Sequence, residues 1–285
     1  IEMETEVVVS PEDDVEIRRM TIVNRSGRNR LLDLTSYIEL SLAPHDADLK
    51  HPAFSKLFVQ TEALTHERAL LAYRRARGKS DAPVFVAHCL TLDETPGEEL
   101  HFETDRRRFI GRGHTLVSPM GASQEPGQSQ GFVLDPIFSL RQRLGLAQGQ
   151  QIQVSMVMAA GESREHVLGL IARYSDSHAI DRAMDLAWGH AQLELRLLHI
   201  EPDDARCFQQ LASHLLYPNL LLRSSVGRIA QNRKGQAGLW AYSISGDLPI
   251  ALAAVSETRD LGLVRQMLNA HTYWRMHGLM VDLVI

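Results

Sequence analysis

The chain has 285 residues, of which 44% are hydrophobic and 23% charged, and it carries a formal net charge of −5. This length and composition are typical of a globular protein of about two domains. The acidic balance argues against a nucleic-acid-binding protein, and no apolar run is long enough to cross a bilayer.

Alternating apolar and polar residues predict β-strands over roughly the first 160 residues. Such half-buried alternation is typical of antiparallel sheets with one solvent-exposed face. The regular spacing of the turns indicates a sandwich rather than β-α-β units. The strand candidates are residues 4–9, 15–23, 32–40, 57–63, 69–74, 84–92, 99–105 and 152–159.

Two polar stretches of this first part, residues 43–55 and 121–131, are predicted to be loops. A basic patch consists of Arg106, Arg107, Arg108 and Arg112. It is either a solvated strand end or loop, or a contact for an anion or a sugar, since arginine binds phosphate with two parallel hydrogen bonds.

The apolar period changes to that of a helix near residue 161. Residues 220–229 are predicted to be helical or irregular. Trp188 and Trp274 lie on apolar helix faces, which favours burial of both side chains in the core. The order of elements predicts an α+β protein of two domains. The clear helix candidates are one capped by Ser163, residues 177–199, one with Pro202 in its first turn, and residues 261–277, closed by Gly278.

The stretch 238–250 is the strongest candidate for a binding site. Trp240 and Tyr242 are followed by a small-residue turn and by Asp247, and Gly246 lets the backbone take a positive φ or approach a ligand closely. A carboxylate accepts hydrogen bonds from two neighbouring sugar hydroxyls, and an aromatic face covers the C–H side of the ring. The stretch therefore predicts a sugar site. The alternative is a turn aspartate in a core-packed loop.

Other catalytic chemistry has little support in the sequence. The 13 histidines include no HExxH or similar spacing, so we expect no metal, and the hydrolase, P-loop and Rossmann motifs do not occur. Cys89 and Cys207 resemble buried thiols more than a disulfide. Glycosyl chemistry needs an acid and, opposite it, a nucleophile or base. Asp247 is one acid, and Asp282 is a second candidate only by default, so we assign no catalytic residue.

Six separated phrases resemble family-94 glycoside phosphorylases, in particular the phosphorylase-like portion of cyclic β-1,2-glucan synthases. One of them is LWAYSISGDLPI, and the resemblance covers essentially the whole chain. They are residues 10–24, 34–44, 51–62, 133–146, 239–250 and 263–285.

The resemblance implies a β-supersandwich over residues 1–160, linker helices over 161–200 and the first part of an (α/α)6 barrel over 201–285. Members cleave a β-glucosidic bond with inorganic phosphate and invert the anomeric centre, while one carboxylic acid protonates the departing oxygen. The family's general acid lies further along the barrel than residue 285. We therefore expect this piece to be inactive alone and to need no cofactor, with phosphate as co-substrate of the parent enzyme.

The resemblance also implies which residues hold the sugar. The family's loop aspartate that binds sugar hydroxyls falls on Asp247. Related disaccharide-cleaving enzymes carry arginines in this loop, whereas residues 241–246 contain none and leave Arg233 as a substitute. The expected substrate-binding residues are thus Asp247, Trp240, Tyr242 and Arg233, and the expected ligand is a β-glucan oligosaccharide.

The wider setting follows from the same resemblance. The chain begins within a strand-like pattern and ends in an apolar run, so we expect an internal piece of a longer protein. A partial barrel exposes apolar helix faces, so we expect self-association, a rearranged helical region or disorder after about residue 200. A homodimer is the expected assembly. We expect a cytoplasmic location without membrane contact by this segment, although the parent can be bound to the inner membrane. The alternative function is a non-catalytic carbohydrate-binding or structural β-sandwich module, whose binding surface would lie near Arg106 and Arg112.

Overall fold

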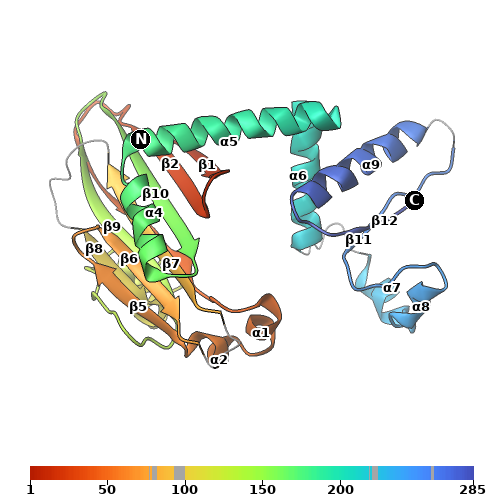
Figure 1. Ribbon diagram of the computed structural model, residues 1–285, viewed down its shortest axis with the longest axis horizontal. Helices are drawn as coiled ribbons and strands as arrows, with labels where there is room; N and C mark the ends of the chain where they lie inside the picture. Colours follow the sequence, from red (N-terminus) through yellow and green to blue (C-terminus); the bar gives the residue numbers. More distant parts are fainter. Residues whose placement is uncertain (77, 79–81, 93–99, 218, 220–223, 258–259) are drawn as a thin grey trace. The chain divides into compact units, whose positions relative to one another are not determined.

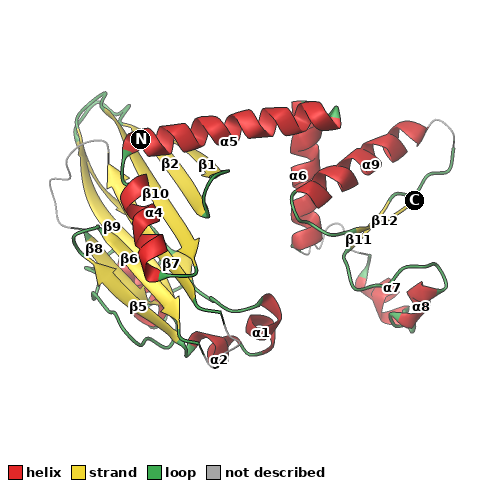
Figure 2. Ribbon diagram, viewed as in Figure 1, coloured by secondary structure: helices red, strands yellow, loops and turns green. Residues whose placement is uncertain are grey.

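The computed structural model spans residues 1–285 and describes all of them except 77, 79–81, 93–99, 218, 220–223 and 258–259. The chain divides into two compact units, Ile1–Trp188 and Gly189–Ile285 (Figure 1). The long strands belong to the first unit, and the second is mainly helical (Figure 2). The protein is thus a mixed α+β chain, as its sequence predicts.

The larger sheet of the first unit has six antiparallel strands in the order β1-β2-β10-β7-β6-β5. Its strands confirm the predicted candidates to within a few residues. Strand β10 pairs with β2 on one side and with β7 on the other, so it joins segments far apart in sequence. The bounds are β1 Glu2–Val9, β2 Val15–Val23, β5 Val59–Leu64, β6 Ala69–Arg74, β7 Val84–Leu92 and β10 Gln151–Gly161.

The second sheet is built on β9 (Pro136–Leu146), which pairs with β3 (Arg30–Thr35), β4 (Ile38–Glu39) and β8 (His101–Asp105), always antiparallel. The sequence does not predict β9. Its polar residues Ser139, Arg141 and Gln142 are buried, which hides the usual alternation. The single strand expected over 32–40 is two strands, β3 and β4, in one register on β9. Between them Ser36 N donates to Leu140 O, but Leu140 N donates to Ser36 Oγ rather than to a main-chain carbonyl.

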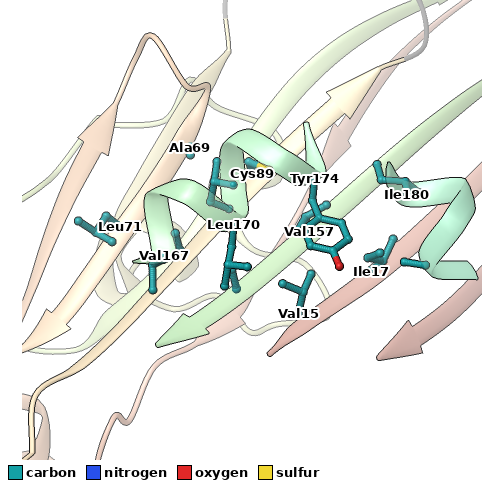
Figure 3. Packing of buried hydrophobic residues seen from close by; sticks show 14 of the residues in the cluster. Val15, Ile17, Ala69, Leu71, Cys89, Val157, Val167, Leu170, Tyr174 and Ile180 are labelled. Carbon is teal, nitrogen blue, oxygen red and sulfur yellow. The ribbon is translucent and has the colours of Figure 1, made fainter. Parts of the chain in front are cut away.

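Side chains on both faces of the larger sheet are buried. One cluster fills the space toward the second sheet and includes Leu70, Phe138 and Val154. The other lies under α4 (Arg164–Tyr174) and the start of α5 (Ser177–Leu198), and includes Leu71. Figure 3 shows Val167, Leu170 and Tyr174 directed from α4 toward the strands.

Because α4 packs on one face of the larger sheet, the expectation of a solvent-exposed face needs correction. Strand β6 is buried at every position but one, so the predicted solvent-exposed face is wrong for the middle of this sheet. Helix α4 begins as expected, since Ser163 Oγ accepts a hydrogen bond from His166 N at 3.1 Å. Each Leu or Ile that the helix and sheet bury together contributes about 2 kcal/mol of hydrophobic free energy.

Short helices occupy two stretches expected to be irregular. Residues 43–55 hold α1 (His45–Lys50) and most of α2 (Pro52–Lys56), so the predicted loop is wrong there. Helix α1 buries none of its residues and has no apolar stripe to reveal it. The basic patch begins with α3 (Arg106–Ile110), and stretch 121–131 is largely irregular, after η1 (Met120–Ala122).

In the second unit, α6 and α9 pack around a small core. Trp274 is buried and donates its indole N–H to the carbonyl of Phe208 at 2.9 Å, which confirms its expected place. Trp188, in contrast, is 69% exposed, so its predicted burial is wrong. The elements are α6 Pro202–Leu216, α7 Val226–Gln231, α8 Ala237–Trp240, β11 Ile250–Leu252, α9 Leu261–Met276 and β12 Asp282–Val284.

The ends of these helices follow the predicted signals. Gly278 has a φ of +75° just after α9, the left-handed conformation that commonly ends a helix. The uncertain stretch 220–229 lies partly outside the described residues, and its remainder enters α7. Among the helices that the structure describes, none is both long and apolar enough to cross a membrane.

Candidate functional site

The predicted sugar loop begins with one helical turn, α8, that the sequence does not reveal. Beyond it the backbone stays tightly turned: Tyr242 N donates to Leu239 O at 2.9 Å, and Ile244 N donates to the same carbonyl at 3.3 Å. Ser243 has a φ of +60°, a conformation that few non-glycine residues adopt. Residues 238–249 thus form a compact series of turns rather than an extended loop, and this segment is called the knuckle below.

Gly246 is required by this geometry. Its φ is +78°, and a Cβ atom there would lie 2.9 Å from Gln236 Cγ and 2.9 Å from Leu239 Cδ1. An L side chain would meet both a strained backbone and a steric clash. The positive φ expected from the sequence is confirmed, and it turns the chain back toward α8.

Asp247 is exposed and its carboxylate is held in place by one side-chain amide. Asp247 Oδ1 accepts a hydrogen bond from Gln236 Nε2 at 2.8 Å, and that amide nitrogen also donates to Ser245 O at 2.9 Å. Asp247 N donates to Ser245 Oγ at 3.2 Å. Asp247 Oδ2 accepts no hydrogen bond from the described residues. The carboxylate is therefore oriented but keeps acceptor capacity for a ligand.

Trp240 is tied to the same point of the knuckle. Its indole N–H donates to Ser245 O at 3.3 Å, and its side chain is 63% exposed. Tyr242 is 72% exposed and Arg233 is also exposed. Neither side chain makes a hydrogen bond or ion pair with another described residue. The structure thus joins Trp240 and Asp247 through Ser245, while no contact among the described residues joins the side chain of Tyr242 or Arg233 to them.

Gln236 is the residue of this cluster that sequence reasoning missed. It lies eleven positions before Asp247, and a glutamine in a polar stretch carries no local signal of its role. Asp282, the second acid considered, lies in β12, which pairs in parallel with β11 directly after the knuckle. Asp282 N donates to Pro249 O at 2.9 Å, and its Oδ2 is buried without a hydrogen-bond partner among the described residues.

This arrangement is suited to binding rather than to bond cleavage. An oriented carboxylate can accept two hydroxyl donors, and an exposed indole can cover an apolar ring face. Within the described residues, no group of three or more His, Cys, Asp or Glu side chains could hold a metal ion.

Two comparisons with known proteins show the family to which the chain belongs. The model of the family "Glycosyl hydrolase 94, supersandwich domain" matches residues 1–177, which take in both large sheets and α4. Cyclic beta-(1,2)-glucan synthase NdvB of Rhizobium meliloti (strain 1021) is 36% identical to the chain over 288 residues. That match covers 99% of this chain and 10% of NdvB, so the chain spans about a tenth of the length of this relative.

Proposed function

We propose that this chain, which belongs to the glycosyl hydrolase 94 supersandwich family, binds β-glucan through the knuckle that carries Asp247. The observation that supports the proposal is the exposed carboxylate of Asp247, oriented by Gln236 and attached through Ser245 to the exposed indole of Trp240. The name of the relative NdvB supports a β-1,2-linked glucan as the ligand.

The contacts of a bound glucose unit follow from this geometry. Asp247 Oδ2 accepts from one hydroxyl, and the remaining lone pair of Oδ1 accepts from the neighbouring one. Trp240 covers the C–H face of the ring, and Tyr242 and Arg233 donate further hydrogen bonds. Hydrogen bonds to a charged group contribute roughly 1.5–3 kcal/mol, and an aromatic contact adds roughly 0.5–1.5 kcal/mol.

The parent protein is proposed to work as its family does. It cleaves or trims a β-glucan by inverting phosphorolysis, with inorganic phosphate as co-substrate. Residues 201–285 form the first part of an (α/α)6 barrel in the parent, after the sandwich (1–160) and the linker helices (161–200). The parent is a homodimer with this segment in the cytoplasm, and the segment alone contributes a wall of the sugar site without turning over substrate.

Isothermal titration of β-1,2-glucan oligosaccharides into the chain tests the binding proposal. Asp247→Ala removes the charged acceptor, so we expect at least a tenfold loss of affinity, about 1.4 kcal/mol. Trp240→Ala should weaken binding by about two- to tenfold. Asp203→Ala is the matched control, since that carboxylate is exposed on α6 of the same unit. Equal affinities for Asp247→Ala and wild type would exclude the knuckle as the site.

The alternative, a sugar surface on the sandwich near Arg106 and Arg112, makes the opposite prediction, with Asp247→Ala silent. Among the described residues, the hollow at that place is lined by arginine, aspartate, isoleucine, glycine and methionine, and by no aromatic ring. Since sugar sites commonly use an aromatic face, this lining favours the knuckle for a neutral glucan.

A further inference from the structure

A second polar site lies on the first unit, independent of the proposed glucan site. An open hollow of about 770 Å³ is formed around α3 and its flanking residues. This size falls within the range of roughly 300–1,000 Å³ that is typical of small-ligand pockets. Its charged lining consists of four arginines and two aspartates: Arg106, Arg107, Arg108, Arg112, Asp105 and Asp135.

The turn that carries these arginines is built rigidly. Phe109 is buried and its ring lies 5.0 Å from that of Tyr37, measured between centroids. Asp105 caps α3 by accepting a hydrogen bond from Arg107 N at 2.9 Å. Gly111 has a φ of +82°, and a Cβ atom there would lie 2.7 Å from Met120 Cβ. The backbone is thus fixed before any ligand arrives.

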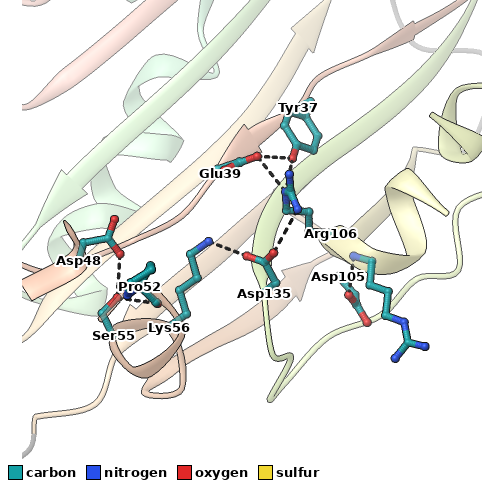
Figure 4. A network of polar contacts seen from close by, with 10 residues as sticks. Tyr37, Glu39, Asp48, Pro52, Ser55, Lys56, Asp105, Arg106 and Asp135 are labelled. Atoms are coloured by element: carbon teal, nitrogen blue, oxygen red, sulfur yellow. Dashed lines mark hydrogen bonds and ion pairs between the residues drawn. The ribbon is translucent and has the colours of Figure 1, made fainter. Parts of the chain in front are cut away.

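Arg106 belongs to this scaffold. Its Nε donates to Glu39 Oε1 at 2.9 Å and to Tyr37 at 3.0 Å, and its Nη1 lies 3.5 Å from Asp135 Oδ2 (Figure 4). Lys56 binds the other oxygen of Asp135 at 2.6 Å. Burial raises the pKa of Tyr37 to about 12, so its hydroxyl stays protonated and donates to Glu39 at 2.7 Å. Arg106 and Asp135 therefore have their charges matched within the protein.

The other three arginines of the hollow have no matching charge of this kind. Arg107, Arg108 and Arg112 are exposed, and their guanidinium groups make no ion pair or hydrogen bond with another described residue. The nearby carboxylate of Glu103 is buried and accepts from the main-chain amides of Thr104, Asp105 and Gly127 instead. Within a protein of net charge −5, the hollow thus concentrates three uncompensated cations on one fixed turn.

We propose that this hollow binds a phosphate group, either free or as a monoester on a saccharide, through Arg107, Arg108 and Arg112. The planar guanidinium group matches the oxygens of phosphate with two parallel hydrogen bonds and remains charged at all physiological pH values. Three such groups suit a dianion better than a carboxylate, and the part of the lining that the structure describes offers no aromatic face to a neutral sugar.

Calorimetric titration at constant ionic strength tests the site, with inorganic phosphate in one arm and glucose 6-phosphate in the other. We expect one saturable site in the wild-type chain. Replacing all three arginines, as Arg107→Gln, Arg108→Gln and Arg112→Gln together, should lower phosphate affinity at least tenfold. Tighter binding of the sugar phosphate would identify a saccharide monoester as the ligand, and equal binding would identify the free anion.

The matched control is Arg28→Gln, which removes the same charge from an exposed turn elsewhere in the first unit and should leave phosphate affinity unchanged. Absence of saturation, an unchanged affinity in the triple variant, or an equal loss in the Arg28 control would each overturn the proposal. If circular dichroism shows the triple variant to be unfolded, Arg112→Gln alone, outside α3, takes its place and should lower affinity at least threefold. Neither titration involves Asp247, so its outcome is separate from that of the glucan experiment.

Discussion

His88 gives the protein an acid-sensitive point in its sandwich. The side chain is 1% exposed and stacks near Phe138, with 6.1 Å between ring centroids. His88 Nδ1 lies 3.0 Å from the carbonyl of Val157, which can only accept, so this nitrogen carries the proton. Nε2 lies 2.9 Å from Ser36 Oγ and accepts the hydroxyl proton. The neutral imidazole therefore uses both nitrogens: Nδ1 binds β10 of its own sheet, and Nε2 binds Ser36, which lies between β3 and β4 of the second sheet.

Protonation of His88 destabilises the folded state. Burial lowers the pKa of His88 from 6.5 to about 4. Below pH ~6.5 the unfolded chain takes up a proton at this position that the folded chain refuses until about pH 4. Stability is therefore lost as the pH falls through this window and levels off below it. At about 1.4 kcal/mol per pH unit, the loss amounts to about 3 kcal/mol.

Urea unfolding followed by far-UV circular dichroism between pH 7 and pH 4 measures this loss. The variant His88→Gln is less stable at pH 7, but its free energy of unfolding should fall by about 3 kcal/mol less than that of wild type over the same range. His166→Gln, at an exposed position on α4, serves as the control and should keep the wild-type dependence. Parallel pH profiles for wild type and His88→Gln would refute the reasoning.

Five further substitutions test the packing. Gly246→Ala should lower the free energy of unfolding by about 1–2 kcal/mol, because Gly246 has a positive φ and close neighbours. Gly262→Ala, in open space on α9, should raise it by about 0.5–1 kcal/mol. Urea unfolding followed by tryptophan fluorescence distinguishes the two variants. Tyr174→Phe keeps the buried ring but removes its hydroxyl contacts of 3.0 and 2.7 Å, so the melting temperature should drop by the equivalent of about 1–3 kcal/mol, and an unchanged value would contradict this. Arg141→Met removes a buried guanidinium group that donates to three main-chain carbonyls and to one carboxylate. It should lower the free energy of unfolding by about 3 kcal/mol. Arg143→Met breaks a more exposed bond to the same carboxylate and should cost about 1 kcal/mol or less; equal losses in chemical denaturation would argue against burial as the cause.

The fold was predictable where one physical signal dominated. The bounds of strand β2 and helix α9 follow closely from the sequence because turn signals flank the strand and Gly278 marks the end of the helix. Strand β9 was missed because Arg141 and Gln142 are buried and satisfied by distant partners, which no local pattern reveals. The pairing of β11 with β12 was also hidden, since each strand is three residues long and their register depends on tertiary contacts.

The candidate site shows the same division. The positive φ of Gly246 is predictable because turn chemistry acts on neighbouring residues, and the role of Asp247 stays a prediction from the family resemblance. Gln236 was not, because its amide reaches Asp247 only after α8 has turned the chain back. The arginines around α3 were noted as a basic patch. The sequence does not reveal which of them is paired, because Glu39 and Asp135 are distant in sequence, and among the described residues they neutralise Arg106 and none of the other three.

The strand order also dictates when the first unit can be completed during synthesis. Strand β10 is inserted between β2 and β7, and β9 is the common partner of β3, β4 and β8. Before residue 161 leaves the ribosome, the nascent chain holds separate hairpins with open edges, which can pair with other chains. A chain cut before β9 therefore retains most of the sandwich's residues but neither finished sheet, and we expect it to aggregate rather than to fold as a smaller domain.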